Sequence, residues 1–169
     1  MSLVSGNGAR SRRDPMHGPD DDPTGAADSA LAQLHGAGFD WLAADASGQV
    51  AVFSSLAALP PPEAVFRGID AHRRALEAIL RSPRCSRSLL PPSTLPEKKF
   101  LWRALADRGL YVYASYRAGA PYWMADAPET PVHVFDLPAF AAGLLGAARP
   151  LALRFRHLSS VTAAVLGPG

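Results

Sequence analysis

The spacing of hydrophobic residues changes several times along this chain, and each spacing predicts a different kind of element. Between residues 39 and 55, two short apolar runs flank the sequence DASG at 45–48. Aspartate bonds its own backbone and glycine tolerates a positive φ, so this centre favours a tight turn. The pattern predicts a β-hairpin with strands at 41–44 and 50–53. Both faces of these strands carry apolar or small residues, so we expect the hairpin to lie centrally under helices.

Apolar residues recur at helical spacing in three further segments, at 28–35, 60–81 and 94–109. The second segment begins with three prolines, which are tolerated in the first turn of a helix. Gly68 weakens its early turns, so two helical pieces are expected there. The third segment begins with a capping box, Thr94–Glu97.

From residue 110 onward the large apolar residues alternate with a period of two, which is typical of strands. A strand at 110–116 and a returning partner at 121–125 are separated by a turn at 118–119. A short strand is expected at 131–135. The last strand, at 151–156, alternates large apolar residues with Ala and Arg, so we expect one buried and one solvent-facing side.

One helix interrupts this alternating region. Asp136 is expected to cap it and Pro138 to occupy its first turn, with Phe140, Leu144 and Leu145 facing the core. The resulting order of elements contains hairpins and few crossovers. It predicts an α+β fold with a mainly antiparallel sheet of about five to six strands packed with three to four helices.

Composition divides the 169 residues into two parts. Residues 1–24 consist largely of Gly, Pro, Asp and Arg, and they cannot bury enough apolar surface to offset the entropy lost on ordering. We therefore predict a disordered N-terminal tail at 1–24 and a single α+β domain at 25–169. Hydrophobic residues make up 48% of the chain, so this domain can bury a core.

The single cysteine, Cys85, rules out an internal disulfide and fits a reducing cytoplasm. No run of about 18 apolar residues occurs, so we expect no membrane span and a cytoplasmic protein. The Ala- and Pro-rich composition is typical of a bacterium with a GC-rich genome.

The motifs of common catalytic and cofactor sites are missing from the sequence. No glycine-rich nucleotide cradle is present, Ser54 and Ser159 lack the glycines of a nucleophile elbow, and no two histidines have close metal-ligand spacing. A Cys85 thiolate paired with a distant histidine would be an alternative catalytic centre. We expect no cofactor and no metal, and the sequence favours a non-enzymatic protein. A small enzyme or ligand-binding domain, whose site converges from distant residues, stays open.

Basic residues concentrate between positions 63 and 108, which carry a net charge of +5 while the whole chain carries +2. A local positive field attracts acidic partners. The segment is interpreted as a solvated helix surface, as a site for an acidic protein, or as a nucleic-acid site. The last is disfavoured because no aromatic RNA-binding motif accompanies the charges. The ten basic residues are Arg67, Arg73, Arg74, Arg81, Arg84, Arg87, Lys98, Lys99, Arg103 and Arg108.

Aromatic residues concentrate on the predicted 110–125 hairpin, where all four tyrosines and one tryptophan lie. Cross-strand pairing explains such a cluster within a sheet. An exposed aromatic face would also bind a protein, because Tyr and Trp dominate interface hot spots. The sequence carries no signal of an oligomeric state. The candidate partner-binding residues are Asp40, Arg73, Arg74, Arg84, Arg87, Tyr116, Tyr122 and Trp123.

Three stretches, FDWLAADASGQVAVFSS, RGLYVYASYRAGAPYWMADAPETPVHVFDLP and PLALRFRHLSS, together resemble a group of small uncharacterised bacterial proteins. Those proteins open with a (D/F)DW(L/V)AxDxxGxVAxF hairpin and end with a VxDLP helix and an amphipathic strand. The resemblance covers residues 38–160, and this chain departs from it in a longer Pro- and Arg-rich segment between the hairpins. Some members resemble immunity proteins of toxin systems. The resemblance therefore implies a non-enzymatic protein-binding domain, immunity-like or accessory.

Overall fold

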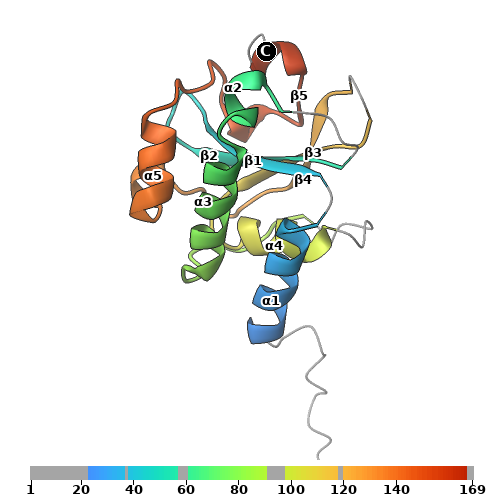
Figure 1. The fold of residues 1–169 in the computed structure, drawn as a ribbon, viewed down its shortest axis with the longest axis vertical. Helices are drawn as coiled ribbons and strands as arrows, with labels where there is room; N and C mark the ends of the chain where they lie inside the picture. Colours follow the sequence, from blue (N-terminus) through green and yellow to red (C-terminus); the bar gives the residue numbers. More distant parts are fainter. Residues whose placement is uncertain (1–22, 37, 57–60, 91–97, 118–119, 167–169) are drawn as a thin grey trace, which may run out of the picture.

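A computed structural model describes most of the chain, with one five-stranded sheet at its centre (Figure 1). The expected tail up to residue 22, the predicted capping box Thr94–Glu97 and the predicted turn at 118–119 lie outside the described residues. The described residues are 23–36, 38–56, 61–90, 98–117 and 120–166.

The strands follow the order β1-β2-β3-β4-β5 across the sheet. Neighbouring strands run antiparallel except β2 and β3, which are parallel and pair Ala51 with Tyr111. The predicted α+β class with a mainly antiparallel sheet is therefore confirmed. The alternation of apolar residues did not predict the parallel pairing of β2 with β3. The strands are β1 (Phe39–Ala44), β2 (Val50–Ser55), β3 (Tyr111–Ser115), β4 (Tyr122–Asp126) and β5 (Ser160–Val161).

The β1–β2 hairpin forms as predicted, and hydrogen bonds to the Asp45 carboxylate fix its turn. Asp45 Oδ1 accepts from the backbone N–H groups of Ser47 (2.8 Å) and Gln49 (3.0 Å). Gly48 has a φ of 79°, a conformation that residues with a side chain seldom adopt. Both turn roles expected of DASG are therefore present.

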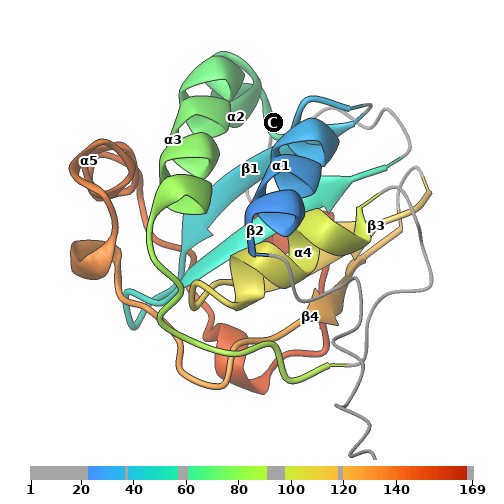
Figure 2. The same cartoon turned by 90° about the horizontal axis from the view of Figure 1, so that it is seen from below.

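The helices α1, α3 and α4 lie over the same face of the sheet (Figure 1, Figure 2). Gly68 separates α2 from α3, as predicted, and α1 begins at Pro23, earlier than the pattern indicated. The α-helices are α1 (Pro23–Leu34), α2 (Glu63–Phe66), α3 (Ile69–Arg81), α4 (Lys99–Ala106) and α5 (Ala139–Gly146), and the 3₁₀ helices are η2 (Val134–Asp136), η3 (Phe155–His157) and η4 (Ala163–Leu166).

The helix-covered face of the sheet holds the larger hydrophobic core. Alternation along the strands directs Leu42, Val52 and Val112 to this face. They pack with Leu76 of α3 and Trp102 of α4, and all five side chains are buried. Burying a large apolar side chain contributes about 1.5–3 kcal/mol to folding, so this core holds α3 and α4 on the sheet.

Aromatic rings form a second core on the opposite face of the sheet. The Phe53 ring stacks on Trp41 and Tyr113, with centroid separations of 4.6 and 5.4 Å. Phe155 joins the cluster from the C-terminal segment, 6.0 Å from Phe53. Figure 1 shows this red segment on the opposite side of the sheet from α1 and α4. The hairpin is thus buried on both faces as expected, but α1, α3 and α4 cover only one of them.

The predicted strand at 151–156 is wrong, although Phe155 is buried as the alternation indicated. This residue begins η3, and the short strand β5 comes later. Its N–H donates to Asp45 Oδ2 (2.9 Å), and its carbonyl accepts from the Tyr113 hydroxyl (3.1 Å). Side chains thereby satisfy the backbone groups that a strand would pair with a neighbouring strand.

The predicted strand at 131–135 is also wrong, because its end forms η2. The Asp136 carboxylate accepts a hydrogen bond from the His133 N–H (3.0 Å) and closes a capping box around this 3₁₀ helix. Asp136 therefore does not cap α5, whose N-cap residue is Pro138.

Helix α5 turns a different side to the core from the one predicted. Leu145 is buried and Leu144 packs against the core, as expected, but Phe140 is 46% exposed. Ala141 is buried instead. Residues 141 and 145 are four positions apart and share one side of the helix, so Phe140 lies off that side.

Candidate functional site

Asp40, at the entrance to β1, lies in a buried ion pair. Its Oδ2 is 2.7 Å from Nζ of Lys98, and its Oδ1 accepts from the Ser54 hydroxyl (2.6 Å). Lys98 Nζ also donates to the Gln33 carbonyl of α1 (2.9 Å). Both charged side chains are at most 3% exposed, and buried charges are tolerated only when such partners replace water. Asp40 therefore stabilises the packing of β1 against α1 and the start of α4, and its buried side chain is not accessible to a partner.

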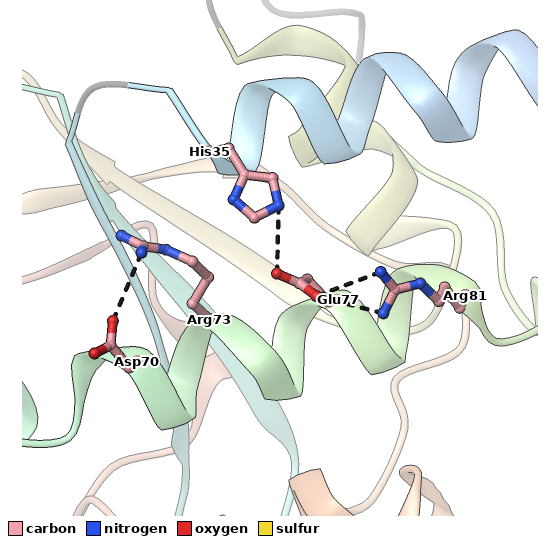
Figure 3. Close-up of polar contacts among 5 residues, drawn as sticks. All are labelled: His35, Asp70, Arg73, Glu77 and Arg81. Atoms are coloured by element: carbon pink, nitrogen blue, oxygen red, sulfur yellow. Dashed lines mark hydrogen bonds and ion pairs between the residues drawn. The ribbon is translucent and has the colours of Figure 1, made fainter.

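Figure 3 shows the polar contacts around Arg73 on α3. Its guanidinium lies 3.6 Å from the Asp70 carboxylate. One turn further along, Glu77 lies 3.3 Å from His35 Nε2 at the end of α1 and 3.3 Å from the Arg81 guanidinium. Exposed pairs of this kind contribute about 0–1 kcal/mol each. The His35–Glu77 contact joins the end of α1 to α3, and the other two pairs lie within α3 and offset the charges of Arg73 and Arg81.

The segment after α3 carries two more candidates, and each of them is paired. Arg84 lies 3.8 Å from the Asp107 carboxylate, and Arg87 lies 3.0 Å from Glu129. Six of the ten basic residues between 63 and 108 pair in this way with described carboxylates. Two of these carboxylates, Glu129 and Asp40, lie outside the segment, so they offset two of its five net positive charges. The six paired basic residues are Arg67, Arg73, Arg81, Arg84, Arg87 and Lys98.

Arg74 and Tyr122 have aromatic neighbours. The Arg74 guanidinium lies over the Phe140 ring of α5, 5.2 Å from its centroid. Tyr122 is buried beside Trp41 and Phe53, with centroid separations of 6.5 and 5.3 Å. Burial raises the pKa of the Tyr122 phenol. Tyr122 is therefore a residue of the aromatic core.

Tyr116 and Trp123 are the two aromatic candidates at the surface, 42% and 51% exposed. Trp123 pairs in register with Ala114, whose side chain belongs to the helix-covered core. Trp123 therefore projects from the face of the sheet that α4 covers. Tyr116 lies on that face too, because its ring centroid is 6.4 Å from that of Trp102 in α4. The structure thus brings these two of the eight candidates to one surface.

Helix α4, which covers this face of the sheet, carries two exposed cations. Lys99 and Arg103 stand four residues apart, so they share one side of the helix. Neither forms an ion pair with a carboxylate among the described residues, and Lys99 Nζ lies 4.8 Å from the Phe100 ring centroid. Helix α4 contacts both β3 and β4 (Figure 2). We call the set of Lys99, Phe100, Arg103, Tyr116 and Trp123 the α4–β4 surface.

A buried carboxyl group lies near Arg103 at the end of β4. The oxygens of Asp126 accept from the Ser88 hydroxyl (2.8 and 2.9 Å) and from the Ala127 N–H (2.8 Å). Burial raises the pKa of Asp126, whereas these hydrogen bonds and the charge of Arg103 oppose the rise. Asp126 and Arg103 lie close enough for their charges to interact, but they do not form an ion pair among the described contacts.

Sequence patterns identify Tyr116 and Trp123 but do not single out the cations of α4. Lys99 and Arg103 belong to the basic segment, and their spacing of four on a predicted helix is the signal that would separate them from the rest. No local pattern identifies Lys98 as the partner of Asp40, because the two residues lie 58 positions apart in the chain.

Among the described residues, no group of three or more His, Cys, Asp or Glu side chains comes together to hold a metal ion. No helix in the described ranges is long and apolar enough to cross a membrane. Comparison of the chain with family models, with curated proteins and with solved structures finds no match. A function therefore has to be argued from the residues of this chain.

Proposed function

We propose that this chain is a non-enzymatic protein-binding domain whose α4–β4 surface docks an acidic protein partner. One observation carries the proposal. Trp123 and Tyr116 are exposed on the face of the sheet that α4 covers, and α4 carries Lys99 and Arg103, two cations without an ion-pair partner among the described residues.

Trp123 supplies the anchor of the proposed interface. A tryptophan buries about 150–250 Å² when it is covered, and about half of this side chain faces water. Trp and Tyr are enriched among hot-spot residues, whose truncation costs about 2 kcal/mol or more. A partner that covers Trp123 would remove this apolar area from water, and this burial would stabilise the complex.

Lys99 and Arg103 define the chemistry of the partner. They place positive charge on the helix that covers the same face of the sheet as the two aromatic rings. Opposite charge across an interface speeds association and disfavours wrong partners. An acidic protein surface with an apolar pocket therefore complements the α4–β4 surface.

The proposed setting is the cytoplasm of a bacterium, in an immunity-like or accessory role. The single cysteine supports a reducing compartment, and the resemblance of the hairpin signatures to small bacterial proteins supports the role. An immunity protein occludes its partner by surface contact and needs no catalytic group. An aromatic and basic surface is suited to that task.

Photo-crosslinking tests the proposal directly. A photoreactive amino acid replaces Trp123 in the full chain inside the native host. The same amino acid replaces Phe135 as a control, because the Phe135 side chain is 85% exposed on η2. We expect a specific protein adduct from position 123 that position 135 does not give. Identical adducts from both positions would contradict the proposal.

Affinity measurements on the captured protein then test the residues. Trp123→Ala should weaken binding about thirtyfold, which corresponds to a hot spot of about 2 kcal/mol, whereas Phe135→Ala should leave affinity unchanged. Lys99→Glu combined with Arg103→Glu should slow association and reduce its salt dependence. Equal affinities for wild type and Trp123→Ala would overturn the assignment of this surface.

A further inference from the structure

Helix α5 is apolar around its whole circumference and yet lies at the surface. Residues 137–148, LPAFAAGLLGAA, include no charged or hydrogen-bonding side chain. A helix of this composition is ordinarily buried on all sides. Figure 2 shows α5 on the outer side of α3, with α1 and α4 on the other side. The exposed residues of this segment are Ala139, Phe140, Gly143, Gly146, Ala147 and Ala148.

The first five of these residues form one continuous face, and Ala148 follows the end of the helix. At about 100° per residue the five fall within an arc of about 120°, with Gly143 near its middle and Phe140 at one edge. A Cβ atom placed on Gly143 or Gly146 would meet no other atom within 4 Å. The face is therefore a flat strip with a single aromatic ring standing at its rim. Arg74 lies over that ring from the α3 side.

The shape of this face is self-complementary. The projecting Phe140 and the low Gly143 and Gly146 lie within two turns of one another on the same side of the helix. A twofold axis beside Gly143 would set each Phe140 over the glycines of the opposite helix. Because the distance between packed helices depends on the side chains at the contact, glycine there permits a close approach. Isologous contacts of this kind build closed dimers.

The charges at the two ends of α5 are complementary in the same arrangement. Asp136 stands before the helix and Arg149 after it, both exposed and neither in an ion pair with a described residue. An antiparallel pair of helices brings each Asp136 toward the opposite Arg149. It also aligns the two helix dipoles favourably.

We propose that α5 is the interface of a homodimer, in which two copies of this chain pack α5 against α5 in antiparallel orientation. The proposal is independent of the α4–β4 surface and stands whether or not that surface binds a partner. Its occupant is a second copy because both the shape and the end charges of the strip complement themselves.

Sedimentation equilibrium of the full chain, at concentrations up to about 200 µM, tests the proposal. If the dissociation constant of the dimer lies below about 200 µM, most of the protein is dimeric at the highest concentration. Wild type and Trp123→Ala, the control on the other surface, should have the mass of a dimer. Gly143→Arg should be monomeric, because its side chain enters open space in one copy and meets the backbone of the other. Circular dichroism checks that this variant is folded.

Charge exchange tests the orientation of the helices. Arg149→Asp should weaken dimerisation about tenfold, and combining it with Asp136→Arg should restore it. A monomeric wild type, or a dimer that Gly143→Arg leaves unchanged, would overturn the interface. A double exchange that weakens the dimer further would overturn the antiparallel arrangement.

Discussion

The charged pair of Asp40 and Lys98 joins β1 to the start of α4 in the buried interior. The carboxylate accepts a hydrogen bond from the Ser54 hydroxyl, and the ammonium donates one to the Gln33 carbonyl of α1. These hydrogen bonds replace the bonds to water that both charged groups lose on burial. Removing one member would leave the other charged and buried, which is a larger penalty than removing both.

Lys98→Met is therefore expected to lower the free energy of unfolding by about 3–5 kcal/mol, measured by urea denaturation. The double variant Asp40→Asn with Lys98→Met should recover most of that loss, because no full charge stays in the core. Arg67→Ala serves as the control. It breaks an exposed pair with Glu63 and should change stability by about 1 kcal/mol or less. Equal losses in the single and double variants would contradict the argument.

At the scale of elements, a histidine links α3 to the first strand. His72 is buried, and its Nδ1 accepts a hydrogen bond from the Leu42 N–H of β1 (3.1 Å). Burial lowers the pKa of His72 below its usual 6.5. The unfolded chain therefore takes up a proton at this position before the folded chain does. The contribution of His72 to stability is complete above pH 6.5 and is lost as pH falls toward the folded pKa.

His72→Asn should flatten this pH dependence, because an asparagine oxygen can accept the same N–H bond and does not titrate. Urea midpoints measured at pH 7, 6 and 5 provide the comparison. His157→Asn, at an exposed position, should keep the slope of the wild type. Burial of Asp126 acts in the opposite direction at lower pH, but it is present in all three proteins and cancels in the difference. Parallel curves for wild type and His72→Asn would contradict the assignment.

Elements were predictable where the residues that determine them lie close together in the chain. The first hairpin follows from Asp45 and Gly48, and the break between α2 and α3 follows from Gly68. The predicted strand at 151–156 fails because the Phe155 N–H bonds to a carboxylate 110 positions away. No local pattern contains that information.

The candidate site was predictable to a similar extent. Aromatic residue types identify Trp123 and Tyr116, and adjacency in a strand already implies that Tyr122 faces the other way from Trp123. Which arginines find a carboxylate depends on how distant segments pack. Arg87, for example, meets Glu129 across 42 positions.

At the scale of the whole molecule, the two faces of the sheet are covered by very different means. Helices cover one face, whereas a segment with only short 3₁₀ turns and a two-residue strand covers much of the aromatic face, together with Val65 of α2 and Ile69 of α3. Phe155 and Val161 belong to that aromatic core and are fully or almost fully buried. The C-terminal segment is therefore part of the core.

A chain that ends at residue 150 is expected to lose cooperative thermal unfolding and to bind an apolar dye, because rings such as Phe53 and Tyr113 would face water. A chain that begins at residue 23 is the matched control and should keep the melting temperature of the full chain. A truncated chain 1–150 that melts cooperatively at the original temperature would show that the segment is dispensable.

The parallel pairing of β2 with β3 has a consequence for the order in which the chain folds. Residues 51 and 111 meet in this pair, so the chain between them, which includes α2, α3 and α4, must be looped before the pair can form. Closing a loop of that length costs more entropy than closing the four-residue turn of the first hairpin, and contacts between distant residues slow folding. The β1–β2 hairpin is therefore expected to assemble early, with the sheet becoming continuous only when the helices have brought β3 to its side.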